Sequence, residues 1–316
     1  MLATFDSRKS YFNDIGTQIT GTQKTAEALK ISGLDYQVEK KEIYLADGTL
    51  VKDKFATVRK DTNDILGVVG KNFNIVQNQQ AFSFIDEIIG NGGADFETAG
   101  VIDNGRGAFV LAKTDPIQIL DDPFDPYILF SNYHDGSGAL KVMFTPIRVW
   151  CQNCLAVASK QASLKLSIKH SNQVMSKLQT AAVVMKNHAV YIEDVKKDAE
   201  ILAVTPFTRE QFEDSLYKLI PTKEDATNTI LSRAEDARVE LLRAYDQADL
   251  QNFNNSAWKA LQAVSDYASH YLPKRDTNNP LIYMQRVQNG EIAAMLGLMI
   301  AIVVAKNPAL KLNLKY

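Results

Sequence analysis

His134 and Asp135 are the residue pair best suited to catalysis. Both lie in the segment HDGSG, and a histidine beside a carboxylate can accept and donate protons as a general base and acid. Arg148 and Asn153 follow within the same stretch, where a guanidinium and an amide could orient an anionic group. One hypothesis is therefore an enzyme that acts on nucleic acid or on a small molecule through His134 and Asp135.

The same segment also has a structural interpretation, which we favour. Gly136 takes turn conformations easily, and the side chains of Asp135 and Ser137 can bond the loop backbone. The flanking residues 126–132 and 139–150 are rich in branched and aromatic side chains, which is typical of strands. The sequence thus predicts a β-hairpin closed by this loop, with Asp135 capping its own turn.

Cys151 and Cys154 form a C-x-x-C pair directly after the second predicted strand. Such a pair can serve as a redox dithiol or as half of a zinc site. A complete zinc site needs two more ligands, and the four histidines of the chain are not spaced as a second pair. We therefore expect packed cysteines, no metal and no cofactor. Two cysteines in 316 residues and no signal-peptide pattern at the start indicate a reducing cytoplasm.

The chain changes character near residue 160. Residues 1–160 alternate strand-like segments with turn signals, interrupted by a few helical patterns. Residues 161–316 are almost wholly helical in pattern, and the apolar residues 293–305 are too few to cross a bilayer. We expect an α+β protein in which an antiparallel β-rich half and an all-helical half pack as one unit, without a membrane segment.

Smaller clusters predict local structure near the expected strands. Arg59 and Asp61 flank a turn, where we expect an ion pair that fixes it. Asn78 precedes a helical pattern, and asparagine is a natural helix N-cap. Arg106 lies among glycines at an expected hairpin tip, where an exposed arginine can contact a phosphate.

Composition places the chain among folded globular proteins, with 46% hydrophobic and 23% charged residues. The net charge of −2 creates no global field that attracts nucleic acid, so any binding would depend on local cations. The sequence contains no glycine-rich phosphate loop of the G-x-G-x-x-G or G-K-[ST] kind. The candidate nucleic-acid contacts are Arg59, Lys60, Lys71, Arg106, Lys141 and Arg148.

Several strings of the sequence resemble one protein family. They are residues 58–82 (VRKDTNDILGVVGKNFNIVQNQQAF), residues 96–113 (FETAGVIDNGRGAFVLAK), the strings NYHDGSGA and TPIRVWCQNCLAVA, and residues 256–270 (SAWKALQAVSDYASH). Over most of the chain, and in consistent order, they are similar to the phage and plasmid protein family known as domain of unknown function 932. The resemblance marks a signature of Gly136, Ser137, Cys151, Gln152 and Asn153, whereas Cys154 stands where the family has threonine.

The resemblance implies carriage on phages and plasmids and does not imply an activity. A β-rich half followed by helices is broadly similar to phage single-strand annealing proteins, which track the DNA backbone with lysine and arginine. We therefore expect a non-enzymatic protein that binds or anneals single-stranded DNA in replication or recombination of a mobile element, as a homo-oligomer. The alternatives are the enzyme considered above and an accessory factor that binds a host protein.

Overall fold

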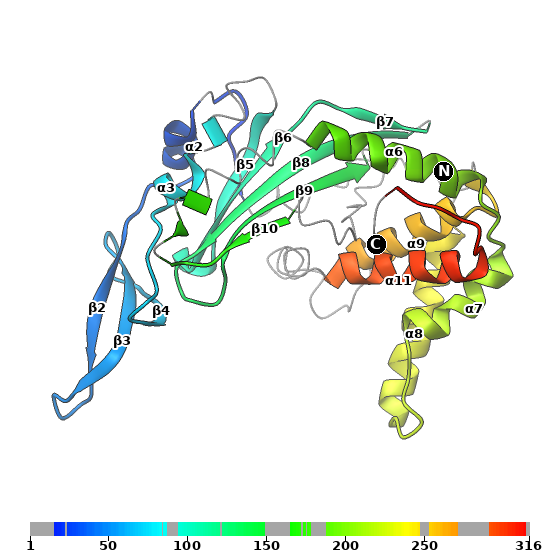
Figure 1. The fold of residues 1–316 in the computed structure, drawn as a ribbon. Coiled ribbons are helices and arrows are strands. Elements are labelled where there is room, and N and C mark those ends of the chain that lie inside the picture. Colours follow the sequence, from blue (N-terminus) through cyan, green and yellow to red (C-terminus); the bar gives the residue numbers. More distant parts are fainter. Residues whose placement is uncertain are drawn as a thin grey trace, which may run out of the picture.

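The N-terminal half of the chain forms antiparallel sheets and the C-terminal half forms helices, so the predicted α+β class is confirmed (Figure 1). The computed structural model describes residues 16–22, 24–83, 85–86, 94–120, 122–148, 165–171, 173–174, 176–177, 188–246, 253–270 and 291–313. The predicted boundary near residue 160 falls outside these residues.

The larger sheet has the strand order β1-β5-β6-β8-β9-β10, and β7 pairs with β8. Its strands are β1 (Thr17–Gln18), β5 (Asp95–Ile102), β6 (Gly107–Lys113), β7 (Ile117–Ile119), β8 (Asp122–Tyr133), β9 (Leu140–Arg148) and β10 (Lys165–Ile168). Residues 108–112 of β6 are fully buried because alanine, phenylalanine, valine and leucine fill both faces of this central strand. Strands β8 and β9 pair as the predicted hairpin, and the loop that begins at His134 joins them.

A second sheet projects from one end of the larger one (Figure 1). It consists of β2 (Val38–Tyr44), β3 (Leu50–Arg59) and β4 (Ile65–Gly70), all antiparallel, and we call residues 38–70 the β-arm. At its base Ala56, Thr57 and Val58 are buried, whereas no residue from 41 to 55 is buried. The distal part of the β-arm is therefore open to solvent on both faces.

Short helices lie near the base of the β-arm, and the long helices lie at the other end of the larger sheet (Figure 1). The short ones are α2 (Thr25–Ile31), α3 (Asn78–Phe82) and the 3₁₀ turn η1 (Asp103–Gly105). The long ones are α6 (His188–Val204), α7 (Arg209–Leu219), α8 (Asn228–Tyr245), α9 (Ala257–His270) and α11 (Glu291–Lys306).

Helix α9 lies at the centre of the helical group and contacts α6, α8 and α11, while α6 also contacts β7. Helix α11 contains the apolar residues 293–305, and Leu296, Met299 and Val303 on it are buried. Within the described residues, no helix combines the length and apolar character needed to span a membrane.

The β-arm and the β8–β9 loop touch backbone to backbone. A Cβ atom on Gly67 of β4 would lie only 2.6 Å from the carbonyl oxygen of Asp135 and 2.7 Å from its Cα. Gly136, with φ +81°, occupies the left-handed region, and a Cβ there would lie 3.0 Å from Cγ1 of Val69. Glycine at these two positions therefore allows the loop to pack on the β-arm.

Replacing Gly67 by alanine should lower the free energy of unfolding by roughly 1–3 kcal/mol, because the added methyl group overlaps the Asp135 backbone. Gly70→Ala is the matched control on the same strand, since a Cβ atom there meets nothing within 4 Å. We expect the control to stay within about 0.5 kcal/mol of the parent. Urea unfolding measures both, and equal effects of the two substitutions would contradict the close packing.

Candidate functional site

His134 lies at the end of β8 and is fully buried, with 0% of its surface exposed. Its Nε2 atom is 3.0 Å from Oδ1 of Asn78, and Asn132 Nδ2 donates to the same oxygen over 3.1 Å. Because this amide oxygen can only accept, His134 carries its proton on Nε2 and donates it to Asn78. The three side chains form a buried hydrogen-bonded cluster, which we call the junction.

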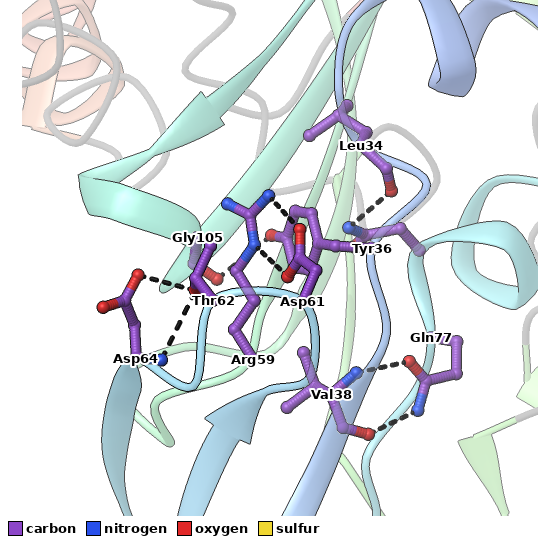
Figure 2. Close-up of polar contacts among 10 residues, drawn as sticks. Leu34, Tyr36, Val38, Arg59, Asp61, Thr62, Asp64, Gln77 and Gly105 are labelled. Carbon is purple, nitrogen blue, oxygen red and sulfur yellow. Dashed lines mark hydrogen bonds and ion pairs between the residues drawn. The ribbon is translucent and has the colours of Figure 1, made fainter.

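Asn78 connects the junction to the segment that leads into the β-arm. Its Nδ2 atom donates to the carbonyl oxygen of Leu34 over 3.1 Å, while its Oδ1 atom faces Asn132 and His134. The neighbouring Gln77 bonds both backbone groups of Val38, accepting from N at 3.0 Å and donating to O at 2.8 Å (Figure 2). These hydrogen bonds of the Gln77 and Asn78 side chains attach the first strand of the β-arm and the residues before it to the start of α3.

The prediction that Asn78 caps this helix is wrong. Gln77 occupies the N-cap position, and its backbone N–H donates to Oε1 of Gln80 over 3.1 Å. Asn78 is the first helical residue and is 1% exposed. Its side chain points into the interior instead of capping the helix, because there it forms hydrogen bonds with three buried polar groups of other segments.

Tyr36 joins the junction to the turn at the base of the β-arm. Its hydroxyl donates to the carbonyl oxygen of Gly105 over 3.0 Å, and its ring meets the His134 ring edge-on with centroids 5.8 Å apart. The guanidinium of Arg59 lies 4.1 Å from the centre of the Tyr36 ring, in a cation–π contact. Burial raises the pKa of Tyr36, so the phenol remains a neutral donor.

Arg59 also makes the predicted ion pair with Asp61. Its Nε and one terminal nitrogen bond the two carboxylate oxygens at 2.8 and 2.9 Å (Figure 2). The hydrogen bonds to Arg59 hold the pKa of Asp61 below its usual value. The side chain of Arg59 is only 17% exposed, so this guanidinium is already engaged by a carboxylate and an aromatic ring.

Asp135 caps its own turn, as the structural interpretation of the loop predicts. Its Oδ1 atom accepts hydrogen bonds from the backbone N and the hydroxyl of Ser137 at 2.9 and 2.6 Å. Within the part of the chain that the structure describes, no hydrogen bond joins the side chains of Asp135 and His134. The two candidate catalytic residues are therefore adjacent in sequence but are held by different partners.

Burial, together with a smaller effect of His170, lowers the pKa of His134 to about 3. Burial also lowers the pKa of His170, whose Nδ1 atom contacts the carbonyl oxygen of Asn74 at 3.1 Å and whose ring stacks on Phe73. Both imidazoles are therefore neutral near pH 7. His134 Nδ1, Asn132 Oδ1 and His170 Nε2 are buried without hydrogen-bond partners among the described residues. Within that part of the chain, no group of three or more His, Cys, Asp or Glu residues is arranged to hold a metal.

The structure places three of the candidate cations near one another and the others elsewhere. Arg59, Lys60 and Arg106 gather where the β-arm meets η1, since a Cβ on Gly105 would lie 3.2 Å from Cδ of Arg59. Lys71 follows β4, and Lys141 lies on β9. The side chain of Arg148 and all of Cys151, Gln152, Asn153 and Cys154 lie outside the described residues.

Four of these cations are paired with carboxylates. The pairs are Arg59–Asp61 at 2.8 Å, Lys60–Glu39 at 3.8 Å, Lys71–Asp53 at 3.2 Å and Arg106–Asp103 at 3.2 Å. A phosphate group would have to compete with these carboxylates. The candidate site thus consists of the neutral, buried junction and, around it, cations whose charges are balanced by carboxylates.

Acid should weaken the folded state through His134. The unfolded histidine has a pKa of 6.5 and the folded one about 3, so the unfolded chain binds the extra proton within this range. The contribution of His134 to the free energy of unfolding is fully present above pH 6.5. Below pH 6.5 it decreases by up to about 1.4 kcal/mol for each pH unit. His134→Gln keeps a donor for Asn78 and should have a flatter profile.

Urea unfolding of both proteins at pH 7, 6 and 5 measures this difference. The carboxylates titrate in both proteins and affect both in the same way. The difference between the two slopes of unfolding free energy against pH therefore comes from His134. Parallel profiles would show that His134 is protonated as easily in the folded chain as in the unfolded one.

The comparisons with known proteins agree with the resemblance noted in the sequence. A family model described as Domain of unknown function (DUF932) matches residues 65–289, which is more than two thirds of the 316 residues. The match includes β4, the junction residues Asn78, Asn132 and His134, and helix α9. No curated protein and no solved structure matches the chain. The chain belongs to the family described as Domain of unknown function (DUF932).

Proposed function

We propose that the protein binds single-stranded DNA without cleaving it, and that it works in replication or recombination of a phage or plasmid. The observation that carries this proposal is the β-arm, a solvent-exposed sheet that projects from the body and is rich in lysine (Figure 1). Its lysines are Lys40, Lys41, Lys52, Lys54 and Lys60, and Lys71 follows its last strand.

Lys52 and Lys54 are the best candidates for phosphate contacts. Both are exposed on β3, and neither forms an ion pair with a carboxylate of the described residues. By contrast, the cations at the base of the β-arm, such as Arg59 and Lys60, are paired with carboxylates. Phosphates can approach these two ammonium groups without displacing a bound carboxylate.

An aromatic side chain near the tip of the β-arm supports binding of a single strand. Tyr44, at the end of β2, is 56% exposed, and its hydroxyl is 2.5 Å from a carboxylate oxygen of Glu42. Unpaired bases stack on exposed aromatic rings, whereas bases in a duplex are already stacked on each other. Exposed lysines on β3 and an exposed tyrosine on the paired strand β2 therefore favour single-stranded over double-stranded DNA.

The buried junction supports binding rather than catalysis. His134 is neutral and inaccessible, and Asp135 is occupied by its own turn. In the proposed function these residues hold the loop on which the β-arm packs. The β-arm itself makes the contacts with DNA.

Titration with labelled single-stranded and double-stranded DNA at several salt concentrations tests the proposal. The parent protein should bind the single strand more tightly, with an affinity that falls as salt rises. Lys52→Gln/Lys54→Gln should weaken single-strand binding roughly 10-fold and reduce the salt slope by about 1.4, because two phosphate contacts are lost. An annealing assay and light scattering show whether binding leads to strand pairing and assembly.

The matched control is Lys218→Gln/Lys223→Gln, which removes two exposed lysines from the helical half. This control should bind like the parent protein. Absence of single-strand binding at low salt would overturn the proposal. Equal losses in the two double variants would show that the β-arm is not the binding surface.

A further inference from the structure

Strand β4 forms one of the two edges of the β-arm, which projects from the body (Figure 1). The strand order is β2-β3-β4, and among the described residues β4 pairs with β3 alone. An edge strand has backbone N–H and C=O groups that point away from the sheet and can pair with a further strand. Whether it does so depends on its side chains and on what covers it.

The opposite edge, formed by β2, is protected against further pairing. Residues 39–42 of this strand (EKKE) are all charged, and charged side chains on an edge strand discourage pairing. The Gln77 side chain also occupies both backbone groups of Val38 at the start of the strand. The outer edge of β2 is therefore unsuited to receive another strand.

The edge formed by β4 is of the opposite kind. Its sequence ILGVVG contains no charged residue and no proline. Ile65 and Val68 are 67% and 58% exposed. They pair with Val58 and Ala56, two positions apart on β3, so they lie on the same face of the β-arm. An uncharged edge strand with exposed branched side chains is a template for strand pairing.

The residues at the two ends of β4 indicate which partner fits. Asp64 comes directly before the strand and Lys71 directly after it, and both are exposed. In an antiparallel pair the start of one strand lies beside the end of the other. Two copies of β4 therefore bring Asp64 of each copy beside Lys71 of the other, so that opposite charges meet at both ends. The segment is thus complementary to a second copy of itself.

We propose that two copies of the protein associate through β4, with the strands antiparallel about a two-fold axis close to Val68. The two β-arms then form one continuous sheet with the strand order β2-β3-β4-β4-β3-β2. The exposed side chains of Ile65 and Val68 from both copies contact one another across the new strand pair. Such an interface uses the same surface of each copy and closes at a dimer. It assigns a surface to the homo-oligomer expected from the sequence and does not depend on DNA binding.

Sedimentation velocity of the full-length protein without DNA tests the interface. The parent should form a dimer at micromolar concentration. Val68→Lys should weaken this dimer by roughly 10-fold or more, because two lysines then face each other across the axis. Val239→Lys on α8 is the matched control, since Val239 is 57% exposed, and it should dimerise like the parent. A monomeric parent, or equal dissociation constants for Val68→Lys and the parent, would overturn the proposal.

Charge reversal tests the antiparallel orientation. Asp64→Lys and Lys71→Asp should each weaken the dimer at low salt, because each brings like charges together at both ends of the strand pair. The double variant Asp64→Lys/Lys71→Asp should recover most of the lost affinity. A double variant that dimerises no better than the single ones would contradict antiparallel pairing of β4.

A cysteine at residue 68 locates the axis. Paired residues of antiparallel strands have Cα atoms about 4.5–5.5 Å apart, which a disulfide can span. Oxidised Val68→Cys should therefore give a covalent dimer on a non-reducing gel, whereas Val239→Cys and the parent, which share Cys151 and Cys154, should not. If Val68→Lys does not fold, Val68→Cys decides the matter. The proposal is wrong if Val68→Cys forms no more covalent dimer than Val239→Cys.

Discussion

The side-chain amide of Asn78 is the interaction on which the N-terminal half depends. It donates to Leu34 before the β-arm and accepts from Asn132 and His134 at the end of β8. These three segments are far apart in sequence and meet where Asn78 is 1% exposed. Because each buried polar group without a partner costs about 1–3 kcal/mol, the amide specifies how the segments are placed relative to one another.

Contacts around the Asn78 amide also fix the position of the β-arm. The Tyr36 ring packs against the Arg59 guanidinium, and its hydroxyl bonds Gly105, so the entrance of the β-arm, its β3–β4 turn and η1 are held together. The β8–β9 loop then packs on Gly67 of β4, with Asp135 fixed by its own turn. The residues that look catalytic in sequence thus have structural roles, and the exposed part of the β-arm remains available for a ligand.

Local patterns in the sequence predicted the features that depend on neighbouring residues. Branched and aromatic residues on both sides of a turn-forming loop predicted the β8–β9 hairpin, and neighbouring residue types predicted the Arg59–Asp61 pair and the Asp135 turn. Asn78 was misplaced because local capping propensity competes with three long-range hydrogen bonds that sequence spacing does not reveal. The burial of Gln262 and Asp266 on α9 was also not predicted, since polar side chains at helical spacing normally lie on the exposed side of a helix.

Hydrogen exchange in Asn78→Leu tests most directly whether Asn78 couples these segments. Leucine has a similar size but leaves the Leu34 carbonyl without its donor and His134 without its acceptor. Backbone amides of residues 34–44 and of residues 132–137 should exchange faster together, whereas Asn307→Leu in the helical half should leave both segments unchanged. Faster exchange confined to α3, or no change in either segment, would contradict the role of Asn78 as the common anchor.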